Sequence, residues 1–196
     1  MGDTAENFHR VKVIGGHIVK MDIVAGSNND EFYTPDYAVY PIVKYLKPNS
    51  TVWCPFDTEE SRYVTILKKK KFNVINTHLD KGQNFFTINP PVCDYVVSNP
   101  PYSKKTEVLQ RLFAIDIPFA MLLGVAGIFE AQRFDLFRCN TFEIMYFDKR
   151  ISYFKSYTDR EPLLNPPFSS IYICHNILPK QIVFEELRKA NLRRLI

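Results

Sequence analysis

The chain has 196 residues, 46% of them hydrophobic and 14% aromatic, and it carries a formal net charge of +4. This composition excludes a disordered chain, and the length fits a single domain with a sizeable core. The mildly basic charge is compatible with a nucleic-acid partner but does not require one.

The cysteines and histidines show no metal-site spacing. There is no Cys-x-x-Cys pair, and three of the four cysteines lie in or beside strand-like segments, which predicts reduced thiols rather than disulfides or zinc ligands. No secretory signal opens the chain, and no apolar run has the length of a membrane span. We therefore expect a cytoplasmic protein with no metal and no membrane partner.

In chain order, residues 1–30 predict an N-terminal arm or hairpin, because short apolar runs are broken by glycines. Residues 31–196 are expected to form one domain, which starts with Thr34 and Pro35 as the cap and first residue of a helix that ends near residue 46. Further helices are predicted over 59–70, 104–114, 128–138 and 180–194, and strands over 51–54, 72–75, 94–98, 119–124, 142–147, 151–154 and 170–174.

The order of these elements predicts the fold class. Strands first alternate with helices and then follow one another, which is typical of an α/β protein. We expect a seven-stranded, mostly parallel sheet with an antiparallel edge strand and helices on both faces.

The corner Asn99-Pro100-Pro101-Tyr102 follows a short apolar strand. Asn offers one carbonyl acceptor and two donors, and the two prolines fix the backbone and remove two N–H groups. Tyr adds a flat aromatic face with a polar tip. A strand that ends in such a corner is suited to hold a planar group that carries an NH2, such as a nucleobase.

Three loops leave the carboxyl ends of strands that are expected to be neighbours. They span residues 54–58, 76–80 and 98–102, and each carries polar or aromatic side chains. In an open α/β sheet, ligands bind outside the carboxyl ends of the strands, where the winding order reverses. The three loops are therefore expected to converge on one site.

Four segments in this order resemble a known family: Tyr33-Thr34-Pro35, residues 52–57, Asn84-Phe85 and residues 94–102. The pattern is similar to the class I, S-adenosylmethionine-dependent amino-methyltransferases, and in particular to the small phage- and prophage-type DNA adenine methyltransferases. The resemblance covers roughly residues 30–175. It implies a Rossmann-like fold, S-adenosylmethionine as cofactor and DNA as substrate.

The resemblance also implies roles for individual residues. Asn99 and the Pro100 carbonyl would accept hydrogen bonds from the target amine, and Tyr102 would stack on the base. Asp57 would hold the cofactor's amino group, and Thr77 with His78 would lie at its ribose. The residues implied in cofactor binding are Tyr33, Thr34, Pro35, Cys54, Pro55, Asp57, Thr77, His78, Asn84, Phe85 and Asn99.

Two features keep other interpretations open. Residues 55–61 contain no glycine, whereas the family's loop at this place is glycine-rich. No separate target-recognition domain is evident, so sequence specificity would be weak or would come from a protein partner. The alternatives are an RNA-adenine or protein-glutamine methyltransferase, which use similar corners, and a non-catalytic nucleic-acid-binding or regulatory module.

The motif has a second copy, Asn165-Pro166-Pro167-Phe168. This copy precedes a predicted strand instead of following one. It would therefore lie at the entrance of that strand, which is the wrong end for a site, and we interpret it as structural.

Overall fold

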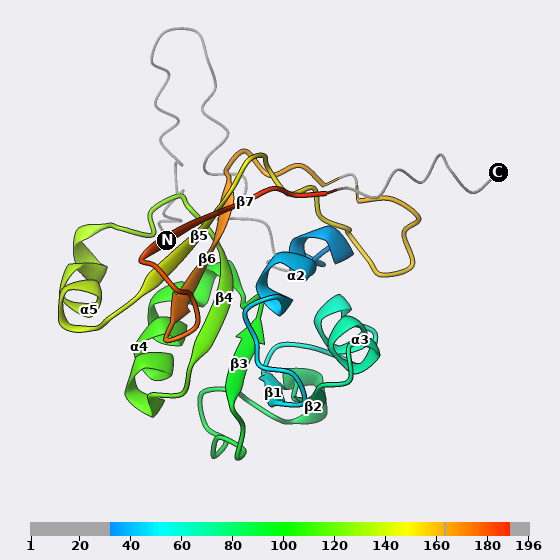
Figure 1. The fold of residues 1–196 in the computed structure, drawn as a ribbon, viewed down its shortest axis with the longest axis horizontal. Helices are drawn as coiled ribbons and strands as arrows, with labels where there is room; N and C mark the ends of the chain where they lie inside the picture. Colours follow the sequence, from blue (N-terminus) through cyan, green and yellow to red (C-terminus); the bar gives the residue numbers. More distant parts are fainter. Residues whose placement is uncertain (1–31, 163, 189–196) are drawn as a thin grey trace, which may run out of the picture.

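One sheet of seven strands runs through the protein (Figure 1), described by a computed structural model over residues 32–162 and 164–188. The predicted arm over residues 1–30 lies outside the described residues. In chain order the strands are β1 (Thr51–Cys54), β2 (Asn73–Asn76), β3 (Tyr95–Ser98), β4 (Phe119–Gly124), β5 (Glu143–Phe147), β6 (Ser170–His175) and β7 (Ile182–Glu185).

The strand order across the sheet is β2-β1-β3-β4-β6-β5-β7. β6 is antiparallel to both β4 and β5, and every other pair is parallel. The prediction of a mostly parallel, seven-stranded α/β sheet is confirmed. The expectation that the antiparallel strand lies at an edge is wrong, because β6 is fully buried and pairs with β4 over six residues, which places it inside the sheet.

Two other sequence predictions are wrong. The predicted helix over residues 180–194 is a strand in its described part, because side chains alternate between exposed and half-buried along β7 with a period of two residues. Residues 151–154 form only single bridges, Tyr33 with Phe154 and Tyr153 with Leu164, so they make no strand of their own.

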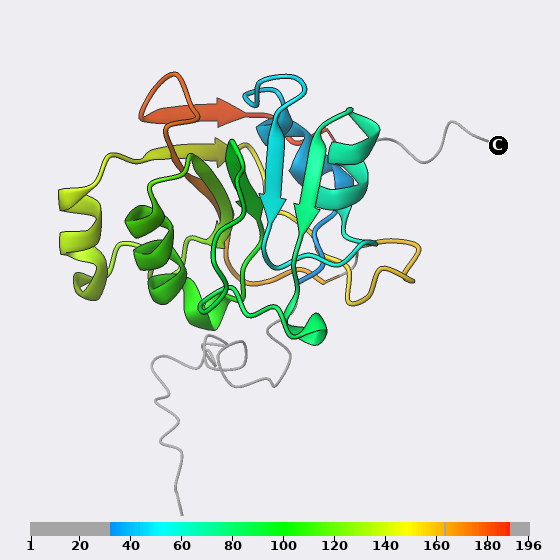
Figure 2. The ribbon, with the colours of Figure 1, turned by 90° about the horizontal axis from the view of Figure 1, so that it is seen from below.

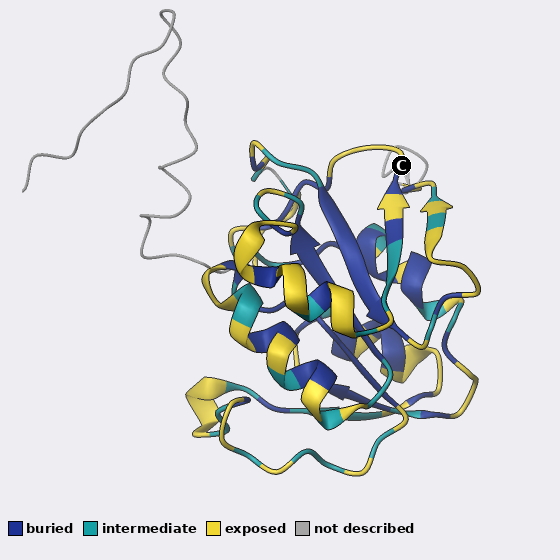
Figure 3. Ribbon diagram, turned by 90° about the vertical axis from the view of Figure 1, so that its left-hand side faces the viewer, coloured by how far each residue is buried: buried dark blue, intermediate teal, exposed yellow. Residues whose placement is uncertain are grey.

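Helices cover both faces of the sheet, as predicted (Figures 1 and 2). α2 (Asp36–Val43) and α3 (Arg62–Lys69) pack on one face, and α4 (Lys105–Ile115) and α5 (Phe134–Cys139) on the other. Neighbouring strand residues enter different cores, so that Val52 faces α2 and α3 while Trp53 faces α4. Figure 3 shows the central strands buried and the helices in front of them exposed on their outer side.

α2 begins later than its sequence suggests. Pro35 takes the N-cap position, its backbone is extended, and no side chain caps the helix. The expectation that Thr34 caps this helix is therefore wrong. None of the described helices is long and apolar enough to cross a membrane.

The winding of the sheet reverses between β1 and β3. From β1 the chain crosses through α3 to β2 on one side, and β3 then pairs with the opposite side of β1. This reversal is a topological switch point, and the crevice beyond the carboxyl ends of β1 and β3 is the place where such sheets bind ligands.

Candidate active site

A buried carboxylate joins the strand ends at the switch point. Asp57, three residues after β1, accepts hydrogen bonds from the Ser61 hydroxyl at the start of α3 and from the Ser98 hydroxyl at the end of β3, the latter at 2.5 Å. Its backbone N–H donates to the Thr77 carbonyl (3.2 Å), and its carbonyl accepts from the Asn76 side chain (3.3 Å). Asp57 thus ties β1, β2, β3 and α3 together.

The surroundings of Asp57 favour its protonated form. Burial raises the pKa of this carboxyl to about 6, although the hydrogen bonds from Ser61 and Ser98 and the nearby His78 act in the opposite direction. Desolvation outweighs them because water no longer reaches the charge.

Asn99 follows β3 directly and has one buried atom without a partner. Its side-chain Nδ2 donates to the Phe32 carbonyl at 2.7 Å. Because a carbonyl only accepts, this bond fixes which side of the amide is nitrogen. The other atom, Oδ1, is buried and has no hydrogen-bond partner among the described residues. An unpaired buried acceptor costs about 1–3 kcal/mol, so the fold alone does not explain it.

Tyr102 is buried and held by a chain of hydroxyl groups. Its hydroxyl lies 2.9 Å from that of Tyr153, which donates to the Ser170 hydroxyl at 2.8 Å. The ring of Phe32 stacks on the Tyr102 ring with centroids 5.1 Å apart, and the Phe168 ring lies 5.5 Å away. One face of Tyr102 is therefore covered by a ring of the same chain.

The two prolines shape the turn between Asn99 and Tyr102. Pro101 is the N-cap residue of the short helix η2 (Tyr102–Lys104), and its carbonyl accepts from the Lys104 N–H at 3.1 Å. Pro100 is buried. The corner thus turns the chain away from the sheet at once after Asn99.

The predicted cofactor residues after β1 and β2 lie together, and several of their polar atoms are used by the fold. The Thr77 hydroxyl accepts from the Trp53 indole at 3.0 Å and donates to the Pro55 carbonyl at 3.5 Å. The Thr77 N–H donates to the Cys54 carbonyl at 3.1 Å. Cys54 is fully buried, and burial raises the pKa of its thiol well above the usual value.

His78 differs from its neighbours because one ring nitrogen has no partner among the described residues. Its Nδ1 accepts from the Asp80 N–H at 3.2 Å at the start of the short helix η1 (Leu79–Lys81). The Asp80 carboxylate lies 3.3 Å from the same Nδ1, so Nε2 is the ring atom left for another hydrogen bond.

The other predicted cofactor residues lie in two separate places. Tyr33 exchanges two backbone hydrogen bonds with Phe154 (2.9 and 3.3 Å), and Thr34 beside it is buried. Phe85 is buried against the rings of Trp53 (5.6 Å) and Phe56 (4.7 Å) on the α4 face of the sheet.

Asn84 is used to shape the loop that carries Phe85, because its side-chain oxygen accepts from the Phe86 N–H at 3.0 Å. The structure thus brings Asp57, Thr77 and His78 to the ends of β1 and β2. It places Asn84 and Phe85 to one side, where the Phe85 ring contacts Phe56 of the loop after β1.

Sequence reasoning missed Phe168 for a topological reason. The second motif copy does precede a strand, but that strand is β6, which is antiparallel to β4 and pairs Ser170 with Gly124. β6 therefore begins at the end of the sheet where the parallel strands have their carboxyl ends. The expectation that the second copy lies at the wrong end is incorrect. A Cβ on Gly124 would lie 2.9 Å from the Phe168 ring, so glycine permits this close approach.

Phe32 and Tyr153 were also missed. Phe32 contacts the Tyr102 ring, and Tyr153 contacts its hydroxyl. Both lie outside the predicted motifs, and no local pattern distinguishes them from core aromatic residues. In the second copy of the motif the asparagine contributes to the fold, because the Asn165 side-chain oxygen accepts from the Ser152 hydroxyl at 2.6 Å.

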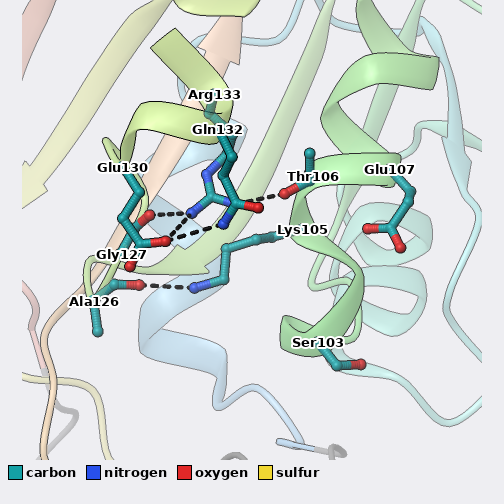
Figure 4. A pocket seen from close by; sticks show the side chains of 9 residues that line it. All are labelled: Ser103, Lys105, Thr106, Glu107, Ala126, Gly127, Glu130, Gln132 and Arg133. Atoms are coloured by element: carbon teal, nitrogen blue, oxygen red, sulfur yellow. Dashed lines mark hydrogen bonds and ion pairs between the residues drawn. The ribbon is translucent and has the colours of Figure 1, made fainter.

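A polar cavity of about 410 Å³ lies beside the corner, at the start of α4 (Figure 4). Its cationic side chains are bound to the loop that follows β4. Lys105 donates to the Ala126 carbonyl at 2.7 Å, and the buried Arg133 bonds the Gly127 and Ile128 carbonyls and the Thr106 hydroxyl. These cations hold the loop against α4.

The polar atoms at the strand ends fit S-adenosylmethionine in part. Each Asp57 oxygen keeps a second lone pair for an amino group, and His78 Nε2 has no partner among the described residues and can hydrogen-bond a ribose hydroxyl. The loop over residues 55–61 lacks the glycine that would let its backbone approach a ligand closely. The fit is therefore better for the ribose and amino group than for the rest of the methionine part.

No protein-family model matches the chain, and no curated protein matches its sequence.

Proposed function

We propose that this protein transfers a methyl group from S-adenosylmethionine to the exocyclic amine of adenine in DNA, on a Rossmann-like class I methyltransferase fold. The observation that carries the proposal is the buried Oδ1 of Asn99, which is unpaired within residues 32–162 and 164–188 and lies three residues before a buried tyrosine at the switch point. A buried acceptor beside an aromatic face suits a flat ring that carries an NH2.

The proposed roles follow from the atoms of the corner. Asn99 Oδ1 and the Pro100 carbonyl accept the two hydrogens of the amine and fix the direction of its lone pair. Stacking of the base on Tyr102 contributes roughly 1–3 kcal/mol. The cofactor supplies the reactive methyl group, and the residues of the chain contribute orientation, which is a large part of the rate in such displacements.

The base must reach Tyr102 in place of Phe32, whose ring stacks there and whose carbonyl is bonded to Asn99. Duplex DNA must in addition release the adenine from its stack, which costs roughly a few kcal/mol. We therefore propose a substrate that is easily unstacked, with weak or short sequence preference unless a protein partner adds specificity.

A second candidate function is a non-catalytic nucleic-acid-binding or regulatory module on the same fold. It is favoured by the same Phe32 ring, which fills the stacking place, and by the glycine-free loop after β1. This module would bind nucleic acid without binding S-adenosylmethionine.

Calorimetry with S-adenosylmethionine separates the two candidates, because only the enzyme binds the cofactor. Transfer of a tritiated methyl group to DNA, RNA and protein pools then identifies the substrate, and mass spectrometry of the nucleosides identifies the methylated base. Label in DNA adenine supports the proposal. Label in RNA adenine or in protein glutamine would show that RNA or protein, and not DNA, is the substrate. Absence of both cofactor binding and methyl transfer would favour the non-catalytic module.

A further inference from the structure

The two edges of the sheet differ in what they offer to another chain. β2 at one edge exposes none of the large hydrophobic side chains of the described residues. β7 at the other edge exposes 49% of Ile182 and 76% of Phe184. Tyr146 of β5 is 46% exposed beside them, with its ring 5.9 Å from that of Phe184. An uncovered apolar edge strand is a template for pairing with another strand.

The backbone of β7 presents its even-numbered residues to the open side. Gln181 and Glu185 turn their carbonyls toward β5, where they accept from the N–H groups of Ile144 (2.7 Å) and Asp148 (3.2 Å). Because peptide groups alternate in direction along a strand, the backbone groups of the even-numbered residues of β7 point away from β5. Within residues 32–162 and 164–188, no strand pairs with that side of β7.

Charged residues at the ends of β7 select one pairing register. Lys180 lies two residues before β7 and Glu186 directly follows it; both are exposed, and neither has an ion-pair partner among the described residues. If two copies of β7 pair antiparallel with Val183 opposite Val183, Lys180 lies opposite Glu186 and Ile182 lies opposite Phe184. Opposite charges and apolar side chains stabilise a sheet when they face each other in this way.

The neighbouring symmetric registers lose these pairs. With Phe184 opposite itself, Lys180 would face Arg188, which is a like-charge pair. With Ile182 opposite itself, Lys180 would face Phe184. Of these three registers, only the one centred on Val183 pairs opposite charges. It also pairs Ile182 with Phe184, whose backbone groups point outward.

We propose that β7 pairs antiparallel with β7 of a second copy of this chain, so that one sheet runs through a two-fold symmetric dimer. Each subunit presents the same residues, and the exposed Ile182 and Phe184 of both copies meet on one face. β4, β6 and β5 separate β7 from β3 and its corner, so the dimer is independent of the proposed methyltransferase function.

Sedimentation velocity over a dilution series tests the dimer. The unmodified chain should show a concentration-dependent equilibrium between monomer and dimer, and Phe184→Pro should be monomeric throughout. Proline here removes an N–H that points outward, so no hydrogen bond to β5 is lost and the fold should survive, as circular dichroism would show. Phe134→Ser removes a phenylalanine of α5 that is also exposed (64%) and serves as the matched control, with unchanged association.

A charge exchange tests the register. Lys180→Glu places like charges opposite each other at two symmetric positions and should raise the dimer Kd roughly tenfold. Adding Glu186→Lys to it should restore the original Kd. The proposal is overturned if the unmodified chain is monomeric at every concentration, if a folded Phe184→Pro variant still dimerises, or if the double variant stays as weak as Lys180→Glu.

Discussion

The two sides of the switch point use their polar groups differently. On the β1 side, each carboxylate oxygen of Asp57 accepts a hydroxyl, and the Thr77 hydroxyl both donates and accepts. On the β3 side, one buried oxygen of Asn99 has no partner in the described part of the chain. Groups with complete bonds stabilise the fold, whereas an unpaired buried group needs another explanation. The difference teaches that the polar groups on the β1 side already contribute bonds to the fold, whereas the Asn99 oxygen on the β3 side contributes none among the described residues.

The largest expected effect is on the β3 side. If the protein is the proposed enzyme, Asn99→Ala should lower the methyl-transfer rate about 10²–10³-fold, because it removes an acceptor aligned with the reacting amine. Tritiated methyl transfer measures the loss. Asn165→Ala, in the second copy of the motif, is the matched control and should keep most of the activity. Full activity of Asn99→Ala would show that the corner does not hold the amine.

On the β1 side the expected effect is on stability. Asp57→Ala leaves the Ser61 and Ser98 hydroxyls without their acceptor and opens space at a junction of four elements. The free energy of unfolding, from urea denaturation, should fall on the order of 3 kcal/mol. Asp135→Ala removes an exposed carboxylate from α5 and should change it by less than about 0.5 kcal/mol. Equal effects of the two variants would contradict the structural role of Asp57.

The pH dependence of stability sharpens the same contrast. The folded pKa of Asp57, about 6, lies above its ordinary value of 3.8, so the folded state binds the proton more tightly than the unfolded state. Its contribution to stability is therefore greatest below pH 3.8 and is lost as the pH rises through 6. Between pH 7 and pH 5 this group should add on the order of 1 kcal/mol to the free energy of unfolding. The difference between the unmodified chain and Asp57→Asn isolates it, and parallel pH profiles would contradict it.

The smallest expected effect concerns the ring that covers Tyr102. Phe32→Ala removes an aromatic pair of roughly 0.5–1.5 kcal/mol, against which a base must compete. An adenine-containing single strand with a fluorescent base analogue should therefore bind roughly threefold to tenfold more tightly. Phe86→Ala, at another partly exposed phenylalanine, should leave the affinity unchanged. Weaker binding by Phe32→Ala would mean that Phe32 contacts the ligand instead of competing with it.

Local pattern predicted the parallel half of the fold well. β4 has the predicted bounds. The loops after β1 and β3 meet through Asp57 and Ser98, because the carboxyl ends of neighbouring parallel strands lie at the same end of the sheet. This half is predictable because strands separated by helices are parallel almost by necessity.

The half that follows β4 was not predictable in the same way. The alternation of side chains in a strand is the same in either direction, so no local signal indicates that β6 is antiparallel or that it lies between β4 and β5. That long-range choice brings Phe168 and Tyr153 to Tyr102. It also leaves β7 at the edge, where a short amphipathic segment is easily taken for the start of a helix.

The reversed direction of β6 also has an evolutionary consequence. The segment between β5 and β6 begins and ends at the end of the sheet where the corner lies. It supplies Tyr153 to the hydroxyl of Tyr102 and Phe168 to its ring. Surface segments tolerate insertions and replacements far better than paired strands do. Selection for a different substrate would therefore act first on this segment. Related chains that diverge in preference should vary in it while they keep Asn99 and its two prolines.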